Sequence, residues 1–134
     1  MKAKLLPLYF AEANEREQTE CREQMARLAE FYGDVAEFLP PVQVGDPLPD
    51  ADAAVFPQMI FAAFRHDEAF RAIKMPIVVL TSRFGTVEMW DWEIVTYLRD
   101  LGCTVFSPYN VELGRCILRA IAVKANLVGA KFLM

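Results

Sequence analysis

The chain has 134 residues, of which 54% are hydrophobic and 24% are charged, a balance typical of sequences that fold into globular domains. This length predicts one domain over residues 1–134, large enough to bury a core without disulfides or a structural metal. The net charge is −4 and no stretch gathers Lys and Arg into a stripe. We therefore expect neither nucleic acid nor a membrane as a partner.

Histidine and cysteine usage limits the chemistry that the chain can perform alone. His66 is the only histidine, which argues against a His-rich metal centre or a Ser-His-Asp triad, and it is expected at the surface or at a helix start. Cys21, Cys103 and Cys116 have no Cys-x-x-Cys spacing and are predicted to be reduced core thiols of a cytoplasmic protein. No catalytic residue and no metal ligand are predicted in this chain.

The first half of the chain predicts three strands and one long helix. A buried strand over 5–10 precedes Asn14, which is expected to cap a helix together with Glu17 in a capping box. Apolar residues at helical spacing continue to Gly33, namely Cys21, Met25, Leu28, Ala29 and Tyr32. A strand over 35–39 closes at Pro40-Pro41, an irregular segment over 44–52 holds Asp50 and Asp52 in a solvated turn, and a third strand covers 53–56.

The second half predicts two further strands among helices. Short helical segments at 59–64 and 67–73 are separated near His66, and a β-branched strand follows over 77–80. Next come a loop over 82–86, a helix that ends at Gly102, a strand over 104–106, and a helix capped by Asn110 that runs through Asn126. This last helix is apolar on two sides, so we expect it to be covered on both.

Alternation of strands and helices is typical of βαβ units with a parallel sheet. The fold class predicted is α/β, a three-layer α/β/α domain with a parallel five-stranded, flavodoxin-like sheet in the order 2-1-3-4-5. The segment Lys131–Met134 resembles the start of a sixth strand and ends without a polar tail, from which we expect the chain to be the N-terminal domain of a longer protein.

In such sheets ligands bind outside the carboxyl ends of the strands. Four loops are expected there, at 11–14, 57–58, 81–86 and 107–110. The first loop has none of the glycine patterns that hold phosphates, which disfavours dinucleotide, flavin and nucleoside triphosphate binding.

The segment over 81–93 concentrates hydroxyls, an Arg, a Gly, two Trp and three carboxylates around one strand-to-helix turn. One interpretation is structural: Thr86 is the N-cap, Glu88 lies near the positive end of the helix, Trp90 is in the core, and Asp91, Trp92 and Glu93 lie on the outer face. The other is functional: the loop lines a polar pocket where aromatic side chains cover a sugar-like ligand.

The motifs Phe84-Gly85-Thr86-Val87-Glu88-Met89-Trp90 and Leu101-Gly102-Cys103-Thr104-Val105-Phe106-Ser107-Pro108-Tyr109-Asn110 resemble the N-terminal domain of the L-fucose isomerase and L-arabinose isomerase family. The resemblance implies a sugar aldose-ketose isomerase of three domains per subunit, with manganese held by later domains. It implies that this domain helps to close the sugar pocket of a neighbouring subunit in a homo-oligomer. The substrate-binding residues implied are Arg83, Phe84, Glu88 and Trp90, and the chain alone is expected to be inactive.

Two alternatives remain open. A receiver-like signalling domain shares the fold, but it needs paired acids after the first strand, an Asp at the end of the third and a Lys after the fifth. The chain has Glu12, Phe56-Pro57 and Ser107-Pro108 at these places, so two of the three requirements fail. A small-molecule binding domain without catalysis fits all the observations.

Overall fold

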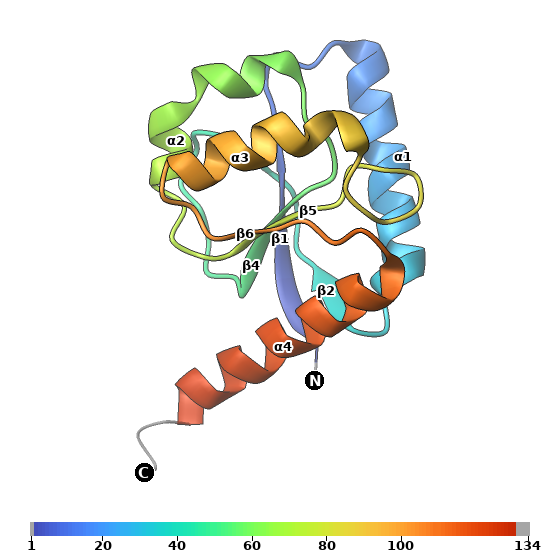
Figure 1. Ribbon diagram of the computed structural model, residues 1–134, viewed down its shortest axis with the longest axis vertical. Helices are drawn as coiled ribbons and strands as arrows, with labels where there is room; N and C mark the ends of the chain where they lie inside the picture. The colour runs from blue at the N-terminus through green and yellow to red at the C-terminus, as the bar shows by residue number, and fades with distance from the viewer. Residues whose placement is uncertain (1, 131–134) are drawn as a thin grey trace.

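The sheet at the centre of the molecule is parallel throughout. The computed structural model describes residues 2–130, without the side chains of Trp90 and residues 127–130. Strands β1 (Ala3–Tyr9), β2 (Ala36–Phe38), β4 (Ala53–Phe56), β5 (Ile77–Val79) and β6 (Val105–Phe106) lie in the order β2-β1-β4-β5-β6 (Figure 1). This order confirms the predicted 2-1-3-4-5 arrangement. The predicted sixth strand, Lys131–Met134, lies outside the described residues.

The edge of the sheet beside β1 is shared by two short strands. β2 pairs with the first half of β1, and β3 (Val42–Gln43) pairs in parallel with Leu8 and Tyr9 at its far end. Proline has no backbone N–H to donate, so Pro40-Pro41 interrupts the pairing between them. The sequence pattern located the interruption but missed the strand that resumes after it.

Helices cover both faces of the sheet, which confirms the three-layer fold (Figure 1). α1 (Glu15–Tyr32) and α4 (Val111–Ala130) pack on one face. The other is covered by η1 (Phe61–Arg65), α2 (Asp67–Arg71) and α3 (Trp92–Asp100). Side chains of β1 alternate between the two cores, since successive residues of a strand point to opposite faces.

The predicted starts of the two long helices are confirmed. Asn14 Oδ1 accepts from the Glu17 amide at 2.8 Å, and Glu17 Oε1 accepts from the Asn14 amide at 3.0 Å, which completes the capping box. Asn110 Oδ1 accepts from the Leu113 amide at 2.7 Å at the start of α4. No helix within residues 2–130 is long and apolar enough to cross a membrane.

The prediction that Thr86 caps the helix after β5 is wrong. The chain first forms a short 3-10 helix, η2 (Met89–Asp91), where Glu88 is the cap and its side chain accepts from the Met89 amide at 3.0 Å. Thr86 is used inside the preceding turn, because its hydroxyl lies 2.7 Å from Ser82 Oγ.

The prediction that α4 is covered on both sides is also wrong for its described side chains. Leu118, Ile121 and Ala122 are buried against the sheet, whereas Val123 is 48% exposed. In the described chain only one layer of helices lies on this face, so a second apolar side of α4 has nothing to pack against. For the same reason Cys116 on α4 is exposed rather than in the core, while Cys21 and Cys103 are half-buried.

Candidate ligand-binding site

A cavity of about 560 Å³ lies between α1 and the loops that follow β4 and β5. This is the carboxyl edge of the sheet, beside the point where the chain order reverses between β1 and β4. Three of the residues that the sequence predicted, Arg83, Phe84 and Glu88, line the cavity together. The side chain of the fourth, Trp90, lies outside the described part of the chain.

The loop after β5 is a compact turn organised by the Ser82 hydroxyl. Ser82 Oγ accepts from the amides of Phe84 at 3.1 Å and Thr86 at 3.3 Å, and it is hydrogen-bonded to the Thr86 hydroxyl. Gly85 has a φ of 75°, in the left-handed region that favours glycine. The turn therefore presents the exposed side chains of Arg83 and Phe84 from a hydrogen-bonded base.

Two side chains of α1 attach this turn to the body of the protein. Gln24, only 3% exposed, donates from Nε2 to the carbonyl oxygens of Leu80 and Ser82, both at 2.7 Å. The Tyr32 hydroxyl donates to the Gly85 carbonyl at 2.5 Å, and burial raises the pKa of Tyr32 to about 12, so the hydroxyl keeps its proton at neutral pH. The turn runs directly beside α1 (Figure 1).

Carboxylates outnumber cations around the cavity. Glu17, Glu20 and Glu23 come from α1, and Glu88 and Asp91 come from the other wall. The cations are Arg27 and Arg83. Arg27 lies 3.9 Å from Glu23 and donates to Gln24 Oε1 at 2.9 Å, whereas Arg83 takes part in none of the ion pairs found within residues 2–130.

The Asp91 carboxyl group of this cavity has a raised pKa. Burial raises its pKa and the neighbouring charge of Glu88 raises it further, while a hydrogen bond from Thr81 lowers it. Thr81 Oγ1 also accepts from the Glu88 amide at 3.0 Å, so Thr81 joins the two acids. The Glu88 and Asp91 carboxylates can accept hydrogen bonds from the hydroxyl groups of a ligand.

Asp91 was expected on the outer face with Trp92 and Glu93, and for Asp91 this is wrong, because it lies half-buried in the cavity wall. Trp92 and Glu93 are exposed, as expected. The sequence patterns did not point to Gln24 or to the acids of α1 as cavity residues. A usable signal was present: Gln24 stands four residues before Leu28 and eight before Tyr32, so it is a polar residue within the buried stripe of the helix.

The other predicted loops contribute less to this cavity. The loop over 11–14 borders a second, apolar hollow of about 640 Å³ between α1 and the ends of β1 and β3. Gln58 borders both hollows and donates to the Glu17 carbonyl at 2.9 Å. The loop over 107–110 contacts the chain just after the turn, where the Pro108 carbonyl accepts a hydrogen bond from the Val87 amide at 3.0 Å.

His66 precedes α2 as expected, but its side chain caps no amide there. Its Nε2 lies 2.8 Å from Glu12 Oε2, which joins the loop after β1 to the start of α2. Within residues 2–130 no three His, Cys, Asp or Glu side chains are arranged to hold a metal ion.

Comparison of the chain with protein-family models, curated proteins and solved structures finds no match.

Proposed function

We propose that this chain is the N-terminal domain of a sugar aldose-ketose isomerase-like protein and contributes one wall of the sugar pocket. The observation that carries the proposal is that Arg83, Phe84 and Glu88 line one cavity at the carboxyl edge of the sheet. These are the positions that the resemblance to the L-fucose and L-arabinose isomerase family implies for sugar binding.

The lining of the cavity supports a neutral, hydroxylated ligand. Carboxylates, the Thr81 hydroxyl and the exposed Arg83 guanidinium offer both acceptors and donors. The excess of carboxylates would repel a phosphate or another anionic group. The Phe84 ring, 67% exposed, can cover an apolar face of a sugar ring.

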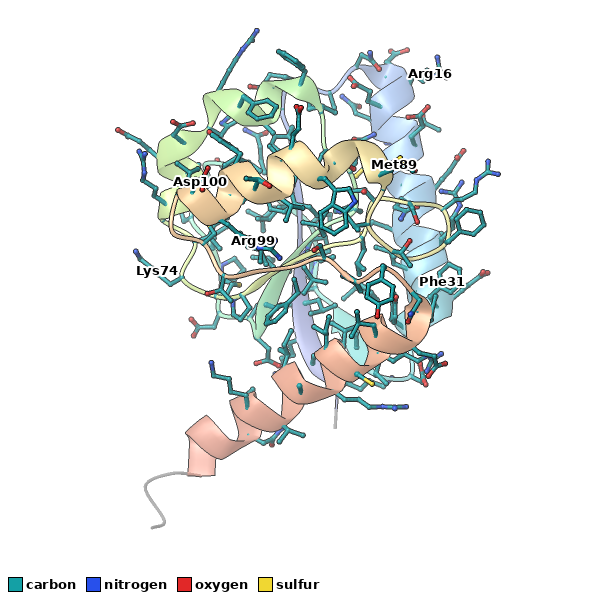
Figure 2. All side chains as sticks on the ribbon, viewed as in Figure 1. Arg16, Phe31, Lys74, Met89, Arg99 and Asp100 are labelled. Carbon is teal, nitrogen blue, oxygen red and sulfur yellow. The ribbon has the colours of Figure 1, made fainter. Side chains whose placement is uncertain are left out.

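Exposed apolar side chains at the same edge support closure of the pocket by another protein surface. Phe61 follows β4, Met89 follows β5 and Tyr109 follows β6, with exposed fractions of 83%, 72% and 73%. Met89 begins η2, just before α3, on the side of the molecule where α1 runs (Figure 2). Large exposed apolar groups beside a cavity are typical of interaction sites, here a neighbouring subunit or a downstream domain.

The proposal assigns no chemical step to this chain. Its residues bind and orient the sugar, and transfer of hydrogen between C1 and C2 falls to later domains, which the resemblance implies hold the manganese. We expect the 134-residue chain to leave L-fucose and L-arabinose unchanged when manganese is added.

Sugar binding is tested by saturation-transfer NMR on this chain with L-fucose and L-arabinose. Glu88→Gln keeps an acceptor for the Met89 amide, and Arg83→Ala removes the exposed guanidinium; each is expected to weaken binding about three- to tenfold. Arg119→Ala, an exposed arginine on α4, is the matched control and should bind like wild type. Equal binding by all the variants, or none by wild type, would contradict the proposal.

A further inference from the structure

The turn that carries Arg83 and Phe84 is held in place by α1 rather than by its own strand and helix alone. Three of its carbonyl oxygens, those of Leu80, Ser82 and Gly85, accept from α1 side chains. We infer that Gln24 is a positioning residue, which keeps this turn in the geometry that binds ligand; the inference rests on the proposed function.

Gln24 is suited to this role by its amide group. Both hydrogens of Nε2 are used, one on the Leu80 carbonyl and one on the Ser82 carbonyl, and Oε1 accepts from Arg27. These partners fix the orientation of the amide, because a reversed amide would place its oxygen against two carbonyl oxygens. A carboxylate has no hydrogen for the two carbonyls. An apolar side chain would leave the Leu80 carbonyl without the Gln24 donor and the Ser82 carbonyl with only the Gly85 amide, at 3.1 Å.

The position of Ser82 transmits this constraint to the ligand-binding residues. Ser82 is 5% exposed, and its hydroxyl oxygen accepts hydrogen bonds from the amides of Phe84 and Thr86. Fixing the Ser82 carbonyl thus fixes the residue on which the whole turn is built. Without Gln24 the turn loses its attachment beside Arg83, so its internal hydrogen bonds open more often and its residues no longer face the acids of α1 in one arrangement.

The test compares Gln24→Met with Leu28→Ala, which lies one turn later in the same buried stripe. Gln24→Met keeps the length of the side chain and removes both donors. We expect it to weaken the binding of L-fucose or L-arabinose about tenfold. Leu28→Ala should lower the melting temperature at least as much, through the cavity that it leaves, yet bind sugar like wild type below its melting range.

Hydrogen exchange provides a readout that overall stability does not move. In Gln24→Met the amides of Phe84 and Thr86 should exchange faster while those in the middle of α1 stay protected. Tyr32→Phe removes only the hydroxyl that donates to the Gly85 carbonyl, so we expect a smaller increase in amide exchange in the same turn. If Gln24→Met does not fold, Tyr32→Phe takes its place in this test. Wild-type affinity together with unchanged exchange in the Gln24 variant would overturn the inference and leave the proposed function standing.

If wild type binds neither sugar, the proposed function is wrong and the ligand-positioning role is overturned with it. Faster exchange confined to residues 82–86 of Gln24→Met would then show Gln24 to be a purely structural attachment. The two failures are therefore distinguishable.

Discussion

The Asp91 carboxyl group shows how a single residue responds to its place in the fold. Half-buried beside Glu88, it is more costly to ionise in the folded chain than in the unfolded one, which is why its pKa is raised. The folded protein consequently binds this proton more tightly, and Asp91 favours folding at low pH. That contribution is lost as the pH rises through the raised pKa of the folded state.

Asp91→Asn is therefore expected to be more stable than wild type at neutral pH, and its advantage should vanish as the pH falls toward the ordinary aspartate value of 3.8. The amide keeps an oxygen that can accept from Thr81 while removing the charge next to Glu88. Urea unfolding of both proteins at several pH values measures the difference. A difference in the free energy of unfolding that does not change with pH would contradict the raised pKa.

Gly85 is constrained both by its backbone conformation and by its neighbours. Its φ is positive, and a Cβ placed on it would lie 2.9 Å from Cδ2 of Phe31 on α1. Gly102, with a φ of 93°, has open space at the same position.

Gly85→Ala should therefore destabilise the protein more than Gly102→Ala. The left-handed backbone costs both variants about 1–2 kcal/mol, and only the first adds the clash with Phe31. Thermal unfolding of the pair checks this. Equal losses would mean that Phe31 moves aside at no cost.

At the scale of the element, α1 serves three purposes along its length. Its start is closed by the capping box, and its buried stripe of Gln24, Leu28 and Tyr32 joins the sheet to the turn after β5. Three of its acids, Glu17, Glu20 and Glu23, line the cavity. Asn14 itself does not line the cavity, so a change at this residue affects helix stability without removing a cavity side chain, and capping and binding can be measured separately.

Asn14→Ala should lower the free energy of unfolding by about 1 kcal/mol, because the Glu17 amide loses its acceptor. Asn14→Ser retains a side-chain oxygen and should recover most of the loss. Chemical denaturation of the three proteins gives the comparison. A full loss in the serine variant would show that the cap acts through something other than this hydrogen bond.

At the scale of the whole molecule, the three layers decide which aromatic residues form the core. Phe70 on α2 is fully buried and contacts the rings of Phe10 and Phe56 at centroid distances of 6.3 and 5.7 Å. Phe61 on η1, only nine positions earlier, is 83% exposed. Their local sequences alone do not separate these two roles.

Phe70→Ala is expected to cost about 3–5 kcal/mol of stability, through lost burial and the cavity that remains. Phe61→Ala should change stability by no more than about 0.5 kcal/mol, since its ring is already in water. Equilibrium unfolding of both variants checks the contrast. A large loss for Phe61→Ala would show that its ring is packed in solution.

Local patterns in the sequence were sufficient for the parallel sheet, its strand order and the caps at Asn14 and Asn110. These features depend on neighbouring residues: apolar runs, side-chain oxygens before a helix, and the handedness of βαβ crossovers. The segment over 81–93, which stood out in the sequence, contains Arg83, Phe84 and Glu88, and these three residues line one cavity.

Only the tertiary structure decided which residues from distant parts of the chain meet. Gln24 and the Ser82 carbonyl are 58 positions apart, and no local pattern records that they are joined. The resumption of the edge strand at Val42, the burial of Asp91 and the exposure of Val123 have the same origin. Each depends on whether another layer or strand covers that position, because burial is a property of the packed molecule and not of a segment.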